Sequence, residues 1–335
     1  MAFFMKLSNR SNEGPGARLS YSLHASLLPE VADRDLLRSH MTVDRPPSQL
    51  PITRRRFLVT GASACAGLAV YSGEIERHWI EIVNQDVRLP GLPKAFDGFR
   101  IAQLSDIHMD EYSEPFLVRD AVNQINRLHP DAVFLTGDFV SYDYWPTRWS
   151  RKMAWQCANL LNELECPHRY AILGNHDVMV NAHEVTRALM DNGMTVLRNA
   201  VLPIERPGGR FWLAGIDDPL FGHPEPDLAI PQAIRHVANE PVILLCHAPD
   251  YVDKLMQLPA GKAVSLVLSG HTHGGQVRLP LVGAMVLPRM GRKYIEGWFR
   301  FGAMQLYVNR GLGTVGVPFR FDCPPEITLH TLRSA

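Results

Sequence analysis

The sequence predicts an α/β fold built from short buried strands and amphipathic helices. Hydrophobic residues make up 46% of the 335 residues, which is enough to bury a large core. Apolar runs of strand length alternate with stretches of helical periodicity, as expected for strands joined by packed helices. The predicted helices span residues 115–128, 151–164, 183–192 and 229–238.

The predicted strands share one feature, because each apolar run stops at polar residues, usually beside a Gly or Pro. In chain order, the runs are residues 100–103, 132–134, 170–172, 211–214, 242–245 and 264–268. Five of them are followed by residues of metal-ligand or acid–base type: Asp106, His108, Asp138, Asn175, His176, Asp177, His247, His271 and His273. In open α/β sheets, ligands bind beyond the carboxyl ends of the strands, so these side chains are expected to converge.

Each of these clusters has a second explanation when it is taken singly, namely a capping Asp or a hydrogen-bonded core His. The same arrangement at five strand ends favours a functional site. Three other polar residues stay ambiguous. Asp217 and Asp218 either line the same cleft or form a turn before a proline, and Arg310 either binds a phosphate or forms a surface salt bridge.

Together, the motifs resemble those of the calcineurin-like metallophosphoesterases. That family shows, in order, Asp-x-His, Gly-Asp, Gly-Asn-His-Asp, a later His and Gly-His-x-His, and this chain has each block between Asp106 and His273. The resemblance runs from about residue 96 to the C-terminus, and residues 246–250, 274–276 and 308–313 are similar to the exported YkuE/YaeI-type branch. The implied fold is a four-layer sandwich of two mixed β-sheets flanked by helices.

The resemblance also implies a centre of two divalent metal ions. Asp138 would bridge the ions. The other implied ligands are Asp106, His108 and His273 for the first ion, and Asn175, His247 and His271 for the second. Oxygen and imidazole ligands without a thiolate suit Mn, Fe or Zn.

In the family, the residue at the position of His176 acts as a general acid or stabilises the transition state, and Asp177 is expected to orient it through one ring nitrogen. The implied activity is hydrolysis of a phosphodiester or phosphomonoester at the cell envelope by a metal-activated water. The alternatives are a pyrophosphatase acting on a nucleotide-linked lipid or sugar of the UDP-diacylglucosamine type, and a non-catalytic metal-binding envelope protein. Either a phosphorylated small molecule or a lipid would serve as substrate. The aromatic segment 139–149 either holds a lipid chain or a base, or packs onto the fold.

The N-terminal region differs from the rest of the chain. Residues 41–75 resemble a twin-arginine export signal, in which Arg54, Arg55 and Arg56 precede an uncharged stretch rich in Ala and Gly. The alternative is a chance arginine triplet in a cytosolic protein. Export would make the twin-arginine machinery a partner and would place the domain, residues 76–335, in the periplasm or at the outer face of the cytoplasmic membrane. The signal would then be cleaved or kept as an anchor at the membrane surface. Residues 1–40 are expected to be disordered or to follow from an incorrectly assigned start.

Charge and cysteine content exclude two other classes of protein. The formal net charge is zero, which gives a nucleic-acid partner no electrostatic support. The five cysteines lack paired spacing and are expected to be free thiols rather than a disulfide framework.

Overall fold

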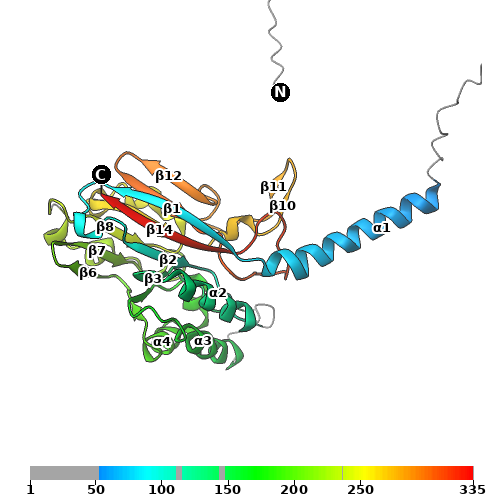
Figure 1. Ribbon diagram of the computed structural model, residues 1–335, viewed down its shortest axis with the longest axis horizontal. Helices are drawn as coiled ribbons and strands as arrows, with labels where there is room; N and C mark the ends of the chain where they lie inside the picture. The colour runs from blue at the N-terminus through cyan, green and yellow to red at the C-terminus, as the bar shows by residue number, and fades with distance from the viewer. Residues whose placement is uncertain (1–52, 111–114, 143–147, 236, 335) are drawn as a thin grey trace, which may run out of the picture. The chain divides into compact units, whose positions relative to one another are not determined.

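Two six-stranded mixed sheets form the centre of the computed structural model, which describes residues 53–110, 115–142, 148–235 and 237–334 (Figure 1). The first sheet has the order β1-β14-β2-β3-β4-β5. In it, β14 pairs parallel with β1 and antiparallel with β2, and β2 to β5 run parallel. Its strands are β1 Glu81–Leu89, β2 Arg100–Leu104, β3 Ala132–Leu135, β4 Arg169–Ala171, β5 Thr195–Val196 and β14 Glu326–Ser334.

The second sheet has the order β12-β13-β9-β8-β7-β6. Its four central strands are parallel, and the two edge strands pair antiparallel. The strands are β6 Ala200–Arg206, β7 Gly209–Gly215, β8 Val242–Leu245, β9 Val264–Ser269, β12 Gly297–Phe301 and β13 Met304–Val308. A separate hairpin consists of β10 Arg278–Leu279 and β11 Gly283–Ala284.

Alternating side chains of the strands fill separate cores. On the first sheet, Ile101 and Phe134 point toward the second sheet, where they pack in one cluster with Phe211 and Leu266. Their neighbours point to the opposite face and pack under helices. Both faces of the central strands are therefore buried, which explains why these strands are continuous apolar runs in the sequence.

Helices cover the outer faces of both sheets. The first sheet is covered by α2 Pro115–Leu128, α3 Arg148–Leu161 and α4 Asn175–Asp191, whose apolar residues join one core cluster with β2 and β3. The second sheet is covered by short elements that include α5 Pro226–Ala229 and α6 Val252–Leu255. The predicted four-layer sandwich of two mixed sheets is confirmed.

One predicted helix is wrong. Instead of a helix over residues 229–238, the described chain has the four-residue α5 and a 3₁₀ turn at Gln232–Ile234. Pro231 lies between them, and proline has no N–H to continue a helix. The prediction followed the apolar spacing and overlooked this break.

The N-terminal helix α1 spans Arg54–Val70 and continues through a π-helical turn, Tyr71–Ile75, and a 3₁₀ turn, Glu76–His78. None of the α1 residues is buried, whereas Ser72 and Glu76 in the following turns are. The helical stretch of 25 residues, Arg54–His78, is long and apolar enough to cross a membrane. Signal sequences have the same length and composition. Residues 1–40 and most of the predicted export signal before α1 lie outside the described residues, so the predicted division at residues 40 and 75 stays a prediction.

Candidate metal centre

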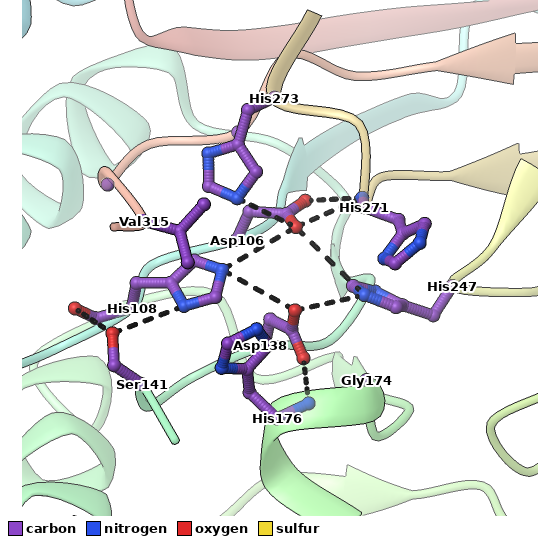
Figure 2. A network of polar contacts seen from close by, with 12 residues as sticks. Asp106, His108, Asp138, Ser141, Gly174, His176, His247, His271, His273 and Val315 are labelled. Carbon is purple, nitrogen blue, oxygen red and sulfur yellow. Dashed lines mark hydrogen bonds and ion pairs between the residues drawn. The ribbon is translucent and has the colours of Figure 1, made fainter. Parts of the chain in front are cut away.

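Residues that follow five strands, three of the first sheet and two of the second, meet at one place (Figure 2). Asp106 and His108 follow β2, and Asp138 follows β3. Asn175 and His176 begin α4, just after β4. From the second sheet, His247 follows β8, and both His271 and His273 follow β9. Among these side chains, only His176 is partly exposed; the rest are buried. The structure thus brings together the side chains that the sequence predicted to converge.

The ligand atoms fall into two groups around two carboxylates, and a third group, His108, Asp138 and His176, overlaps both. In the first group, His273 Nε2 lies 3.5 Å and His108 Nε2 lies 4.0 Å from Asp106 Oδ1. In the second, Asp138 groups with His247 and His271, their donor atoms lying within 4.8 Å of one another. Asp138 Oδ2 connects the two groups, because it lies 3.4 Å from His108 Nε2 and 3.1 Å from His247 Nε2. This is the arrangement that a bridging carboxylate needs.

Three buried side-chain atoms that could bind a metal have no hydrogen-bond partner among the described residues. They are His108 Nε2, His247 Nε2 and Asn175 Oδ1. Leaving a buried polar atom unpaired costs about 1–3 kcal/mol, and unpaired atoms are rare in folded proteins. Divalent cations bound between these atoms would satisfy all three, so the side chains fit the implied metal ions.

Hydrogen bonds from the outer ring nitrogens set which nitrogen faces the centre. His247 Nδ1 donates to the Thr136 carbonyl at 2.7 Å, so Nε2 is the nitrogen that faces the centre. His271 is turned the other way: Nε2 donates to the Arg289 carbonyl at 2.8 Å, and Nδ1 stays available. His108 Nδ1 lies 3.3 Å from Ser141 Oγ, whose hydroxyl donates to Asp110 Oδ2 at 2.5 Å. The two carbonyl partners could not be predicted from the sequence, because every residue type has a carbonyl.

Asp138 is held at the N-terminus of α4. Its Oδ1 accepts the His176 backbone N–H at 2.8 Å, where the helix dipole favours a negative charge. Gly174 makes this approach possible, because a Cβ at that position would overlap Asp138 Oδ1. The Gly-Asn-His motif therefore places a ligand and also makes room for the bridging carboxylate.

Backbone strain is concentrated at the same residues. Five non-glycine residues of the centre have left-handed φ angles: Asp106 at 50°, His108 at 47°, Asp138 at 57°, His271 at 74° and His273 at 51°. Such conformations cost about 1–3 kcal/mol each and persist where the surrounding structure enforces them, typically at functional sites.

A pocket of about 480 Å³ opens beside the centre. One wall carries the polar side chains, including His108, Asp138, Asn175 and His176. The apolar part of the lining, here called the apolar wall, is formed by Val277, Met285, Val286, Pro288, Val315 and Val317. A larger open hollow of about 960 Å³ lies at residues 92–94, 205–210 and 238–240 and includes none of the predicted ligands.

Comparison with known proteins assigns the chain to a family. The model of the family described as calcineurin-like phosphoesterase matches residues 99–275. The chain belongs to this family. It is 34% identical over 293 residues to the uncharacterized metallophosphoesterase YkuE of Bacillus subtilis, covering 84% of this chain and 98% of YkuE. It is also 33% identical to phosphodiesterase YaeI of Escherichia coli, covering 84% of this chain and 99% of YaeI. A Danio rerio protein named "transmembrane protein with metallophosphoesterase domain" is 30% identical, covering 81% of this chain and 61% of that protein.

Family membership confirms the predicted class of enzyme. The chain is a metal-dependent phosphoric ester hydrolase of a family that uses a dinuclear metal centre, and its own buried Asp, Asn and His side chains are candidate ligands. The oxygen and imidazole ligands suit Mn, Fe or Zn.

The orienting role predicted for Asp177 is wrong. Its carboxylate accepts the backbone N–H groups of Gly174 at 2.9 Å, Asp138 at 2.8 Å and Phe139 at 2.9 Å. His176 Nδ1 instead accepts the backbone N–H of Tyr142 at 2.8 Å. Asp177 therefore fixes the loop that carries Asp138, and a backbone amide orients the His176 ring.

Replacing Asp177 with alanine is expected to destabilise the metal-free protein by about 2–5 kcal/mol, because buried N–H groups lose their acceptor. Urea unfolding of the metal-free protein measures this. Asp120→Ala on α2, whose carboxylate accepts from the Gln124 side chain near the surface, is the control and should change the free energy of unfolding by less than about 0.5 kcal/mol. Full stability of Asp177→Ala with a reduced kcat would restore the orienting role.

Weaker candidates from the sequence have structural roles. Arg198 forms an ion pair with Asp217 at 2.8 Å, and Asp218 accepts the N–H groups of residues 220 and 221 in a turn. Arg310 pairs with Glu326 at 2.6 Å and does not line the pocket. In the aromatic segment, Phe139 is buried, and residues 143–147 lie outside the described residues.

The buried carboxylates of the metal-free centre keep His247 protonated. Burial favours neutral His247, but the negative charges of Asp138 and Asp106 outweigh it and raise the His247 pKa to about 10. Burial, together with the His247 charge, lowers the pKa of His271 to about 3. At pH 7 the empty centre thus carries a proton on His247 that a metal ion must displace.

Metal binding at pH 7 is therefore expected to release at least one proton. Since His247 is protonated below its pKa of about 10, the apparent affinity should rise about tenfold per pH unit as the pH increases from 6 to 8. Calorimetric titration of the metal-free protein with Mn²⁺ in two buffers of different protonation enthalpy counts the protons. A heat that is independent of the buffer would contradict the protonated His247.

Proposed function

We propose that this protein is a phosphodiesterase of the cell envelope, with Asp138 bridging two divalent ions. The observation that carries the proposal is the pair of ligand groups that share Asp138 beneath a pocket with one apolar wall. When bound, two such ions lower the pKa of water and neutralise charge on phosphoryl oxygens. The substrate proposed is an ester whose phosphate reaches the centre while its second ester group lies on the apolar wall.

The pocket favours a diester over a monoester. Among the described residues that line it, none is Lys or Arg, so these residues offer a phosphomonoester dianion no cationic side chain. A diester carries only one negative charge, and its second ester group adds surface that can be buried against Val277, Val286 and Val315. The name of YaeI, a phosphodiesterase, agrees with this preference.

His176 is the residue proposed to act on the substrate directly. Its Nδ1 accepts from the Tyr142 N–H, so the proton of the neutral ring is on Nε2. Burial lowers the pKa of His176 to about 4, which keeps the ring neutral at physiological pH. His176 lines the pocket beside Asp138, so Nε2–H can donate to a phosphoryl or leaving-group oxygen.

We also propose that the twin-arginine machinery exports the chain and that α1 stays as an anchor. Arg54, Arg55 and Arg56 precede the apolar stretch, and positive charges favour the cytoplasmic side. The turns after α1 are integrated into the domain, since Ser72 O accepts the Arg320 N–H at 3.0 Å and Glu76 Oε1 accepts the Cys323 N–H at 2.6 Å. The transmembrane name of the Danio rerio relative is consistent with an anchor. Intact mass measurement of the membrane-bound protein tests this; a mature chain that starts after residue 78 would exclude the anchor.

Substrate preference is tested on the full chain loaded with Mn²⁺. The panel comprises an aryl phosphodiester, the corresponding monoester, a nucleotide-linked sugar and a phospholipid, with product masses measured. The proposal expects a higher kcat/KM for the diester than for the monoester, and the reverse order would overturn it. Cleavage confined to the pyrophosphate bond of the nucleotide-linked compound would support the pyrophosphatase alternative instead. Failure to cleave any of them with two metal ions bound would indicate a metal-binding protein.

A further inference from the structure

The apolar wall of the pocket continues onto the surface of the protein. The apolar rim, as we term it, comprises the exposed side chains Leu281, Val282, Met285, Val286, Val315 and Val317. Leu281, at the tip of the β10–β11 hairpin, is fully exposed, and Val286 is 79% exposed. Four of the six residues, Met285, Val286, Val315 and Val317, also line the pocket. Clustered exposed aliphatic residues beside a functional pocket indicate a contact surface.

The turn between β10 and β11 holds Leu281 in a backbone conformation that is unfavourable for leucine. Val282 N–H bonds to the Leu279 carbonyl at 3.1 Å, which closes a turn over Pro280 and Leu281. Leu281 has a φ of 67°, a conformation for which turns normally use Gly or Asn. Because Leu281 is fully exposed, its side chain makes no packing contact that offsets the cost of this conformation. A binding partner outside the protein would explain why leucine occupies this position.

The rim is joined to the metal centre by one side chain. Gln276 lies three residues after His273. It donates to the carbonyls of Val315 at 3.2 Å and Val317 at 2.9 Å, and it accepts the Val315 N–H at 2.9 Å. Met285 N–H donates to the carbonyl of Val277, the residue after Gln276, at 3.1 Å. Both halves of the rim are thus held to the segment that follows His273, so whatever contacts the rim also faces the pocket mouth.

The segment that carries Val315 and Val317 continues to residues 320 and 321, which bond to the end of the N-terminal helix and to β10. Arg320 N–H donates to Ser72 O at 3.0 Å, and Arg278 N–H, in β10, donates to Phe321 O at 2.9 Å. In Figure 1 the C-terminal end of α1 accordingly lies near β10 and β11. Exposed aromatic side chains surround this junction: Tyr71, Trp79 and Phe319. Aromatic residues at the end of an apolar helix are typical of the membrane–water interface.

We infer that the apolar rim docks on the lipid bilayer and holds the pocket mouth at the membrane surface. This inference rests on the proposed anchoring by α1, since a helix end in the interface brings the bonded rim to the same depth. Aliphatic side chains at the hairpin tip suit the acyl boundary, whereas protein interfaces are enriched in Trp, Tyr and Arg at their centres. A bilayer is therefore the occupant that these residues favour over a protein partner.

The test uses the full chain in phosphatidylcholine vesicles, with an environment-sensitive fluorophore at one cysteine. Cys65 is exposed and is replaced by serine, and the other four cysteines are buried. The reporter is Val282→Cys, and the control is Met190→Cys, an exposed residue of α4. We expect a blue shift and quenching by nitroxide lipids at residue 282 and neither at residue 190. Adding Leu281→Asp should abolish the shift at residue 282.

A water-like spectrum at residue 282 in vesicles would overturn the inference. So would shielding that persists in the absence of lipid and increases with protein concentration, because it would assign the rim to a second copy of the chain. Turnover of a water-soluble aryl phosphodiester is measured on the same samples and should be unchanged by Leu281→Asp. Loss of docking with normal turnover would refute only the inference, whereas docking of a protein that cleaves no phosphorus ester would refute only the proposed function.

Discussion

Replacing Asp138 with alanine is expected to abolish binding of two metal ions and hydrolysis together. Asp138 Oδ2 lies 3.4 Å from His108 Nε2 and 3.1 Å from His247 Nε2, closer to both rings than Asp106 Oδ1, which lies 4.0 Å from each. Loss of Asp138 leaves the imidazoles, the Asn175 amide and a single buried Asp, Asp106, to hold two dications. Because metal ions contribute several kcal/mol to transition-state stabilisation, kcat/KM should fall by about 10³-fold or more.

Metal content measured by mass spectrometry, alongside the aryl phosphodiester assay, checks this result. Asp217→Ala is the matched control, since Asp217 is also a buried carboxylate after a strand but pairs with Arg198 outside the pocket. That variant should lose stability and keep both metal ions. An Asp138→Ala protein that retains two metal equivalents would show that Asp138 does not bridge the ions.

The central sheets and the position of the site could be predicted from local patterns. An apolar run such as 264–268 is buried on both faces, and the strand must end where polar side chains begin. His271 and His273 follow that run, and the carboxyl ends of parallel strands gather at one edge of a sheet. Proximity of the ligands therefore follows from the fold class and the order of the motifs.

Contacts that depend on backbone atoms could not be predicted. Asp177 is adjacent to His176 in sequence, yet its carboxylate bonds to the N–H groups of Asp138 and Phe139 far along the chain. Adjacency on a helix start does not make two side chains face each other. The apolar rim was missed for another reason, because Leu281 and Val282 have the composition of a core segment and only their exposure marks them as a surface.

His176→Ala is expected to keep both metal ions and lose about 10²–10⁴-fold in kcat, the range that one positioned proton donor supplies. His176 lies near His108 and Asp138, but the groups Asp106, His108, His273 and Asp138, His247, His271 each have three members without it. Its neutral ring, with a pKa of about 4, holds the Nε2 proton. His176→Gln is the informative second variant. Its amide N–H can reach toward the position of Nε2 and should restore part of the rate.

The leaving group separates the two roles open to His176. If Nε2–H protonates the leaving oxygen, the loss in His176→Ala should be small for a p-nitrophenyl ester, whose anion leaves readily, and large for an alkyl ester. If Nε2–H stabilises the phosphoryl oxygens, both esters should lose equally, because those oxygens are common to them. An unimpaired rate with both esters would remove His176 from the reaction and would leave the Tyr142–His176 hydrogen bond as a purely structural link between the loop after β3 and α4.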